Sequence, residues 1–200
     1  VGLTTMLGAP KVCKSLIALQ SAVVATTEGI AALYVDFENG PHRTNKRLRA
    51  FDTYGKDCFY YLSVRDFSSD GLERMIDKVS GHGKRLVFVI IDSIQKLPTR
   101  ASFAWEDQRQ WLLVLERLKV EFPAVVLAIS EKNRAYYNHA GLGAGKGSGS
   151  IEYNSDLVIN VDRDEDKVFM QVLAHRDVML NRHNAFGEYR LVNGVLRRQK

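Results

Sequence analysis

Eight consecutive residues near the amino end have the types and the spacing that could bind phosphate: Gly8, Ala9, Pro10, Lys11, Val12, Cys13, Lys14 and Ser15. Strand-like composition precedes them at residues 3–7, and helical periodicity follows at residues 14–27. In a strand–loop–helix unit of this kind the loop N–H groups bind phosphate oxygens, Lys14 neutralises the β- and γ-phosphates, and Ser15 ligates Mg²⁺. We therefore expect a nucleoside triphosphate here. The alternative is a strand-to-helix turn whose Lys-Ser pair only begins the helix.

Cys13 stands where the pattern Gly-x-x-x-x-Gly-Lys-Ser/Thr has its second glycine. If the backbone at this position is left-handed, a Cβ costs about 1–2 kcal/mol and crowds the phosphate. If the backbone is ordinary, Cys13 fits without strain. The peptide N–H is present in either case, so the substitution puts turnover in question more than nucleotide binding.

Two acidic residues follow strand-like runs and could serve phosphate chemistry. Asp92 ends a continuous apolar run at residues 86–91, which is typical of a central parallel strand. We expect this strand next to the one before the phosphate loop, so that Asp92 holds Mg²⁺ together with Ser15. Glu38 follows an earlier strand-like run and could orient or deprotonate an attacking water, with Asp36 as the second choice. The simpler alternatives are a turn or capping role for Asp92 and a solvated loop position for Glu38.

The elements that position these residues alternate between strand and helix. Helical spacing is expected at residues 14–27, 43–51, 72–79 and 108–122, and strands at residues 3–7, 32–37, 59–64, 86–91, 124–129, 157–161, 168–173 and 189–196. Asn193-Gly194 is a strong hairpin turn signal. The predicted fold class is α/β: a mostly parallel twisted sheet flanked by helices, with an antiparallel extension at the carboxyl end.

Composition limits the possible classes of protein. Hydrophobic residues make up 46% and charged residues 26% of the 200 residues, which argues against a disordered or collagen-like chain. No apolar run reaches the length that spans a bilayer, and no signal-peptide pattern begins the chain, so a cytoplasmic protein without a membrane partner is expected. Cys13 and Cys58 sit in no metal-ligand spacing, and a disulfide is not expected.

The domain organisation and the charge add two expectations. The length fits a single domain over residues 1–200, and the start at Val1 suggests a domain taken from a longer protein. The net charge of +5 is compatible with a nucleic-acid partner without establishing one. Basic residues at positions 43, 46, 47 and 49 form either a DNA-facing stripe or a solvated helix face.

The phosphate loop, the glutamate after the next strand and the later aspartate occur in an order that resembles the RecA superfamily. Residues 143–159 resemble the Gly-Ser-Ile-Glu…Ala-Asp-Val-Val stretch of DnaB-like replicative helicases, and residues 129–134 resemble their Ser-Gln-Leu-Asn-Arg motif. The resemblance covers essentially the whole chain and implies a RecA-like ATPase domain that uses ATP and Mg²⁺, acts in DNA replication and forms a ring, most simply a hexamer.

The resemblance also implies sites beyond the phosphate loop. In that family the loop corresponding to residues 135–149 faces the central channel and contacts single-stranded DNA; the expected nucleic-acid contacts are Lys132, Arg134, Tyr136, Tyr137 and Lys146. The alternative is a surface loop whose tyrosines pack on the domain. Glu131 occupies the place of the polar sensor Gln beside the nucleotide.

Residues 173–176 resemble the family's Lys-x-Arg motif, which makes Arg176 the candidate arginine finger supplied to a neighbouring subunit. The family's lysine is Ala174 here. The alternative is that Arg176 is a plain surface arginine.

Three readings follow from these observations. The first is an ATP-hydrolysing, helicase-like motor on single-stranded DNA, with Lys14, Glu38 and Arg176 in the catalytic roles. The second is a nucleotide-binding regulatory protein of the same fold, which Cys13, Glu131 and Ala174 favour. The third is a recombinase-like filament protein that coats DNA.

Overall fold

A mixed sheet forms the centre of the protein in the computed structural model, which describes residues 2–51, 56–63, 68–83, 85–97, 104–133, 153–177 and 185–199. The parallel strands are β1 (Gly2–Gly8), β2 (Ala31–Asp36), β3 (Phe59–Ser63), β4 (Val87–Asp92), β5 (Ala124–Glu131) and β6 (Leu157–Asp164). The antiparallel strands are β7 (Lys167–His175), β8 (Ala185–Val192) and β9 (Val195–Arg198). The order across the described sheet is β3-β2-β4-β5-β1-β6-β7-β8-β9.

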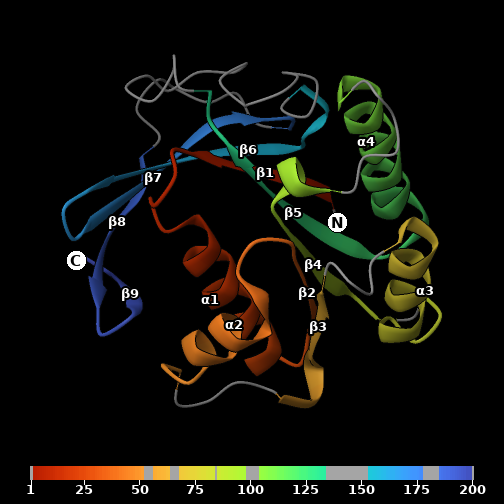
Figure 1. Cartoon of the computed structure of the whole chain (residues 1–200), viewed down its shortest axis with the longest axis horizontal. Coiled ribbons are helices and arrows are strands. Elements are labelled where there is room, and N and C mark those ends of the chain that lie inside the picture. Colours follow the sequence, from red (N-terminus) through yellow and green to blue (C-terminus); the bar gives the residue numbers. More distant parts are fainter. Residues whose placement is uncertain are drawn as a thin grey trace.

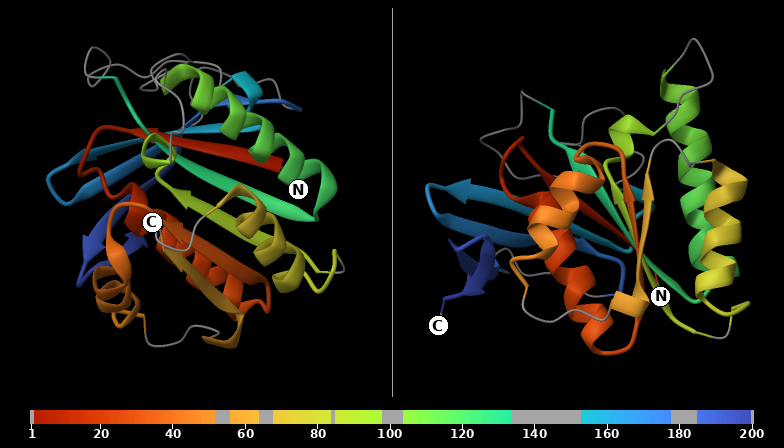
Figure 2. Two further views of the ribbon diagram at one scale, coloured as in Figure 1. Left: turned by 45° about the vertical axis from the view of Figure 1, so that its right-hand side comes forward. Right: turned by 60° about the horizontal axis from the view of Figure 1, so that its bottom comes forward.

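Helices cover both faces of the parallel part of this sheet (Figures 1 and 2). The helices α1 (Lys14–Thr27) and α2 (Gly40–Leu48) lie on one face, and α3 (Ser69–Val79) and α4 (Ala104–Glu121) lie on the other. Two short 3₁₀ helices, η1 (Lys56–Cys58) and η3 (Ile94–Lys96), complete the described elements. This arrangement confirms the predicted α/β class with its antiparallel extension at the carboxyl end.

Because helices cover both faces, the central strands carry buried side chains on both sides. Val87, Val89 and Ile91 of β4 pack toward α3 and α4, whereas Ile90 joins the cluster around α1. The apolar run that predicted a central strand therefore supplies both hydrophobic cores.

The position of β4 corrects one expectation. We expected β4 beside β1, but β5 lies between them and pairs with both in parallel register. A parallel pair requires a crossover connection, so neighbours in such a sheet need not follow the order of the chain. Asp92 nevertheless ends β4 at the same edge of the sheet at which β1 ends, because all these strands point the same way.

Local signals explain the boundaries of α1, of α2 and of the turn between β8 and β9. The helix α1 has the predicted bounds, and the turn at Asn193 (φ 51°) and Gly194 (φ 80°) joins β8 to β9 as predicted. The helix α2 begins earlier and ends earlier than predicted, since Pro41 occupies its first turn and Phe51 closes a tight turn on the Leu48 carbonyl after the helix.

The edge strand β9 is tied to α1 by one side chain. The Gln20 amide Nε2 donates to the Leu196 carbonyl (2.8 Å), and the Leu196 N–H donates to Gln20 Oε1 (2.9 Å). Gln20 thus takes the place that the backbone of a further strand would occupy.

No helix within the described ranges has both the length and the apolar character needed to cross a membrane.

Candidate nucleotide-binding site

The candidate phosphate loop joins the end of β1 to the start of α1. A Cβ added at Gly8 would lie 2.6 Å from the Val161 carbonyl oxygen and 2.7 Å from Val12 Cγ2, so only glycine fits there. Lys11 (φ 68°) and Cys13 (φ 73°) are both left-handed, which curves the loop back toward the amino end of α1. The Leu16 and Ile17 N–H groups donate to the Cys13 carbonyl, and no side-chain hydrogen bond from Cys13 caps the helix, so the N–H groups of Lys14 and Ser15 are the ones that a ligand can use.

The conformation of Cys13 decides between the two alternatives left by the sequence. Its backbone is left-handed (φ 73°, ψ 15°), so the Cβ costs about 1–2 kcal/mol relative to glycine. Its sulfur accepts a hydrogen bond from Arg163 Nη1 (3.6 Å), and the same guanidinium group contacts the Lys11 carbonyl (3.4 Å). The loop therefore tolerates a strained residue and is held from the side by β6.

Lys14 is folded back onto the loop, where its Nζ donates to the carbonyls of Gly8 and Ala9, each at 2.8 Å. Burial lowers the pKa of Lys14, and the nearby carboxylates of Glu131, Glu38 and Asp92 only partly oppose this shift. A phosphate would replace weak carbonyl partners by full negative charges, which strengthens both the hydrogen bonds and the charged form of Lys14.

Asp92 is almost completely buried, with 1% of its surface exposed. Its Oδ2 accepts hydrogen bonds from the Tyr34 hydroxyl (2.6 Å) and the Asn39 amide (3.1 Å), whereas Oδ1 is buried without a hydrogen-bond partner in the described part of the chain. Burial raises the pKa of the Asp92 carboxyl, against the opposing effect of the nearby Tyr34 and Ser15 hydroxyls. A buried oxygen that lacks a partner costs free energy, and such an atom calls for a ligand or an ion as its explanation.

The residues present fit Mg²⁺. Magnesium prefers hard oxygen ligands, usually takes only one or two carboxylates, and keeps waters and phosphate oxygens in its remaining positions. Asp92 Oδ1 and the Ser15 hydroxyl supply oxygen donors of this kind beside the phosphate loop. The described residues contain no group of three or more His, Cys, Asp or Glu that could hold a metal by itself, so an ion here would depend on the nucleotide.

Glu38 and Asp36 have different surroundings, although two positions separate them. Asp36 accepts hydrogen bonds from the Glu38 and Asn39 N–H groups through Oδ1, and from the Thr44 and Tyr61 hydroxyls through Oδ2. These donors use the carboxylate fully, so Asp36 organises the loop before α2. Glu38 instead faces the cavity, where its Oε1 accepts a hydrogen bond from the Ser93 hydroxyl (2.6 Å). The geometry thus favours Glu38 over Asp36 for chemistry.

These residues surround one cavity of about 520 Å³. A cavity of this size suits a nucleotide. Its lining combines expected residues, namely Pro10, Lys11, Cys13, Lys14, Ser15, Glu38, Asp92 and Glu131, with residues that the sequence did not single out for it, namely Leu16, Arg43, Arg47, Ser93, Ile129, Arg163 and Leu191. Of the remaining loop residues, Gly8 and Ala9 contribute carbonyls to Lys14, and Val12 is buried in the core around α1.

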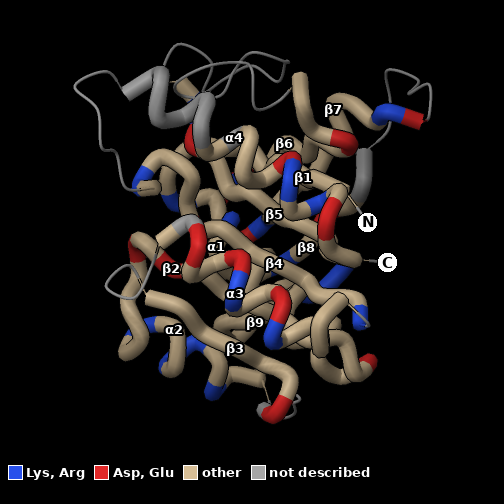
Figure 3. The backbone as a smooth tube through the Cα atoms, turned by 90° about the vertical axis from the view of Figure 1, so that its right-hand side faces the viewer, with Lys and Arg blue, Asp and Glu red and all other residues tan. Residues whose placement is uncertain are grey.

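Three of the unexpected lining residues are arginines. Arg43 and Arg47 are one helical turn apart on α2, so they share a face, and Lys and Arg recur along this helix in Figure 3. Their spacing of four residues, shortly after Glu38 in the chain, could have predicted that both arginines lie near the cavity. Arg163 comes from β6, far along the chain, and only the pairing of β6 with β1 places it near the loop, so no local pattern could have found it.

The expected nucleic-acid residues have mixed outcomes. Lys132 is fully buried, and its Nζ lies 3.4 Å from Asp162 Oδ1. This burial argues against the expected contact between Lys132 and nucleic acid, because the ammonium group is already enclosed and paired. Its place directly after β5, which is flanked on both sides by other strands, accounts for this burial. Arg134, Tyr136, Tyr137 and Lys146 lie outside the described residues.

Arg176 lies at the opposite edge of the sheet from the phosphate loop. It follows β7 and contacts Asp156, which precedes β6 at the edge where the parallel strands begin. Its side chain is 52% exposed, and it is not among the residues that line the phosphate cavity. Arg176 therefore cannot serve the nucleotide site of its own chain without a large movement.

Comparisons with known proteins agree with this geometry. A family profile described as an AAA domain matches residues 1–133. The chain superposes on the ATPase domain of G40P with a TM-score of 0.83 at 16% identity, over 100% of this chain and 85% of that one. A DnaB-like replicative helicase, solved for its interactions with primase, gives a TM-score of 0.84 at 16% identity over 98% of this chain, which spans 57% of the helicase chain. The KaiC-like protein PH0186 from Pyrococcus horikoshii OT3 gives 0.75 at 17% identity, over 100% of this chain and 89% of that one. No curated protein sequence matches the chain.

A phosphate loop between β1 and α1, with a buried acid at the same edge of a mostly parallel sheet, defines a P-loop domain with a RecA-like fold. Within that class the chain belongs to the AAA domain family, whose profile covers about two thirds of it.

Proposed function

We propose that this chain is the ATP-binding and ATP-hydrolysing domain of a helicase-like motor that acts on single-stranded DNA as a ring-shaped oligomer, most simply a hexamer. The observation that carries the proposal is the cavity at the carboxyl edge of the sheet. It combines a phosphate loop with Lys14, a buried Asp92 whose Oδ1 lacks a partner, and Glu38 facing the same space.

Each residue has a defined role in this proposal. The loop N–H groups and the start of α1 bind the phosphates, and Lys14 leaves the carbonyls of Gly8 and Ala9 to neutralise the β- and γ-oxygens. Ser15 and Asp92 would hold Mg²⁺, which spreads the charge of the phosphates when it is bound. Glu38, whose Oε1 is fixed by the Ser93 hydroxyl, orients the attacking water and accepts its proton.

The position of Arg176 supports the proposed ring. An arginine finger stabilises the charge that develops on the transferred phosphoryl group, and Arg176 is too far round the sheet to reach its own site. A head-to-tail assembly would bring the Arg176 edge of one subunit to the phosphate edge of the next, and such a heterologous interface closes into a ring when the rotation permits.

Single-stranded DNA is the polyanion that the resemblance favours. The net charge of +5 supports an anionic partner, and the expected contact loop at residues 135–149 contains glycines, two tyrosines and Lys146. Helicase domains of the same fold are among the structures on which the chain superposes, at identities that carry the fold alone.

A second candidate function is a nucleotide-controlled switch with weak turnover. Cys13 favours it, because a left-handed residue with a Cβ stands in the phosphate loop. Glu131 adds a carboxylate beside Lys14, in the place where the resemblance leads us to expect a neutral amide. A negative charge here would repel the γ-phosphate and slow its transfer.

Steady-state ATP hydrolysis with and without single-stranded DNA tests the proposal. The comparison includes Lys14→Ala and, as a matched control, Lys78→Ala, which removes an exposed lysine from α3 on the other face. We expect DNA-stimulated turnover that Lys14→Ala abolishes and Lys78→Ala preserves. ATP binding without turnover would favour the switch, and a chain that binds no nucleotide would refute both functions.

A further inference from the structure

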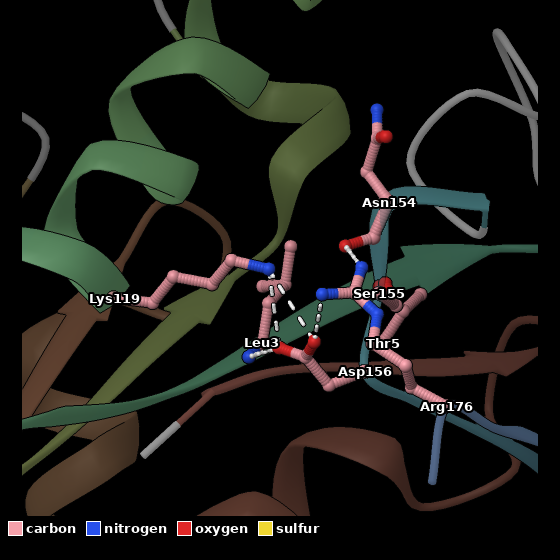
Figure 4. A network of polar contacts seen from close by, with 7 residues as sticks. All are labelled: Leu3, Thr5, Lys119, Asn154, Ser155, Asp156 and Arg176. Carbon is pink, nitrogen blue, oxygen red and sulfur yellow. Dashed lines mark hydrogen bonds and ion pairs between the residues drawn. The ribbon is translucent and has the colours of Figure 1, made fainter.

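The amino edge of the sheet contains a network centred on Asp156 (Figure 4). Its Oδ1 accepts Arg176 Nη1 at 2.6 Å, and its Oδ2 accepts the Leu3 N–H at 2.7 Å. Lys119 of α4 reaches the same carboxylate, with its Nζ 3.2 Å from Oδ2. One carboxylate therefore joins residues from β1, α4 and the end of β7.

Asp156 itself is fixed in place by the backbone. Its N–H donates to the Leu3 carbonyl (2.8 Å), and its own carbonyl accepts the Arg176 N–H (2.8 Å). The neighbouring Ser155 hydroxyl forms a buried hydrogen bond of 2.6 Å with the Thr5 hydroxyl. Both the main chain and the side chain of Arg176 are consequently attached to a residue that is locked onto β1.

The contacts on Arg176 restrain its guanidinium group without enclosing it. Nη1 pairs with Asp156 and Nη2 lies 3.4 Å from the Asn154 carbonyl, whereas the side chain is still 52% exposed. The planar guanidinium has five donors, so donors remain for an anionic ligand. A surface arginine without these two contacts would sample many rotamers and would lose that freedom on engaging a phosphate.

The charges at this edge are also suited to a phosphate. The single carboxylate of Asp156 is shared by two cations, Lys119 and Arg176, so the cluster of three keeps a positive charge. Burial alone would raise the pKa of Asp156, but the Leu3 N–H and the Lys119 ammonium together lower it, so the carboxylate is ionised when it holds Arg176.

We propose that Asp156 is a positioning residue for Arg176, which it holds at the amino edge of the sheet in the orientation that reaches the nucleotide of a neighbouring subunit. This inference rests on the proposed function, in which Arg176 acts in trans. The inference adds that Arg176 acts as a finger only while Asp156 holds its guanidinium group in one orientation. Residues that hydrogen-bond to a metal ligand orient that ligand in the same way.

A double-mutant cycle on ATP hydrolysis by the full chain tests the inference, using Asp156→Asn, Arg176→Ala and the double variant. Asparagine keeps the shape of the side chain and an oxygen for the Leu3 N–H, but it loses the charge that holds Arg176. We expect kcat to fall about 10- to 100-fold in Asp156→Asn, as when an orienting group is removed, with an unchanged KM for ATP. In the Arg176→Ala background the same change should cause no further loss, because there is nothing left to position.

The matched control is Asp166→Asn, which removes the carboxylate from another Asp–Arg pair of the same sheet, with Arg190 Nε at 3.5 Å. It should leave kcat unchanged. A lower Tm of Asp156→Asn is expected for either role; a purely structural role would lower kcat only in proportion to the folded fraction at the assay temperature, and its loss would add to the Arg176→Ala loss. If Asp156→Asn fails to fold, Asp156→Glu replaces it in the test, because it keeps the charge but displaces the carboxylate. We expect Asp156→Glu to lower kcat by a smaller factor than the factor given for Asp156→Asn, and to leave the KM for ATP unchanged.

The outcomes separate the inference from the proposed function. If Arg176→Ala lowers kcat but folded Asp156→Asn does not, or if the two losses add, the positioning role is refuted while the motor stands. If Arg176→Ala leaves turnover unchanged, or if the unchanged chain hydrolyses no ATP, the finger is refuted and the positioning role with it.

Discussion

Two aspartates at opposite edges of the parallel sheet, Asp92 and Asp156, have opposite surroundings. At the carboxyl edge, Asp92 is buried with an oxygen that lacks a hydrogen-bond partner, and its pKa is raised. At the amino edge, Asp156 is surrounded by donors, and its pKa is lowered. The contrast between these two carboxylates indicates where a ligand binds: the carboxylate with an oxygen that lacks a partner is prepared for a ligand, whereas the carboxylate surrounded by donors is prepared to hold a side chain still.

The proposed function joins these edges in pairs, one from each of two subunits. A variant of Lys14 or Glu38 therefore impairs hydrolysis of the nucleotide bound to its own chain. A variant of Arg176 impairs hydrolysis of the nucleotide bound to the neighbouring subunit.

Glu38→Gln should lower kcat about 10²- to 10⁴-fold, the usual contribution of a positioned acid or base, while ATP still binds. The amide can accept the Ser93 hydrogen bond but cannot take a proton. Hydrolysis and equilibrium ATP binding measured on the same preparation provide the check, and Glu28→Gln, at the far end of α1, is the control. Equal losses of binding and turnover would contradict the assigned role.

Mixtures of variant subunits should recover hydrolysis only when the two variants affect opposite edges of the sheet. Subunits carrying Glu38→Gln, mixed with subunits carrying Arg176→Ala, should recover hydrolysis to about a quarter of the normal rate, because random head-to-tail interfaces pair an intact site with an intact finger that often. Glu38→Gln mixed with Lys14→Ala should recover nothing, since both damage the same edge. Recovery of hydrolysis in both mixtures, or in neither, would contradict the assignment of the nucleotide site and the arginine finger to opposite edges.

Asp92→Asn should stabilise the fold while abolishing Mg²⁺-dependent turnover. The raised pKa means that the ionised carboxyl is tolerated less well in the folded than in the unfolded chain, so its cost is complete above the folded pKa and disappears as the pH falls toward 3.8. Removing this cost should raise Tm at neutral pH.

Asp156→Asn should change the stability of the fold in the opposite direction and lower Tm at neutral pH. A lowered folded pKa stabilises the chain above the unfolded value of 3.8, and this stabilisation is lost as the pH falls through the folded pKa. Thermal unfolding of the two variants between pH 3 and pH 7.5 should therefore give Tm changes of opposite sign at neutral pH. The Asp92→Asn change shrinks as the pH falls toward 3.8, whereas the Asp156→Asn change shrinks only below 3.8. Two changes of the same sign at neutral pH would show that the edges do not differ as described.

Cys13→Gly should have the smallest effect on stability. Glycine removes the left-handed strain of about 1–2 kcal/mol but gives the unfolded chain about 0.5–1 kcal/mol more entropy, so a net gain below about 1.5 kcal/mol is expected. Denaturant unfolding measures this gain. An accompanying rise in kcat would show that Cys13 restrains turnover, whereas unchanged hydrolysis would show that the Cβ is accommodated.

Local patterns in the sequence predicted elements and the phosphate loop well. Periodicity located α1 at its observed bounds, and Asn193-Gly194 located the hairpin of β8 and β9, because both signals depend on neighbours in the chain. The acids Glu38 and Asp92 could be assigned to one edge from strand direction alone, since every parallel strand ends at the same side.

Features that depend on strand order could not be predicted in this way. The insertion of β5 between β1 and β4 is a matter of topology, as is the approach of Arg163 to the loop. Lys132 illustrates the same limit, because its charge suggested a surface role and only the packing around β5 reveals its burial. The hydrogen bonds that occupy Asp36 likewise come from Thr44 on α2 and Tyr61 on β3.

The link between Gln20 and Leu196 has a consequence for the behaviour of the protein in concentrated solution. An edge strand offers its free backbone groups to any other strand, which makes it a starting point for aggregation. By holding both the N–H and the carbonyl of Leu196, Gln20 removes an adjacent donor and acceptor from β9. A foreign strand could then pair with this edge only by displacing a side chain of α1, so the helix that begins at the phosphate loop also protects the far end of the sheet from growing.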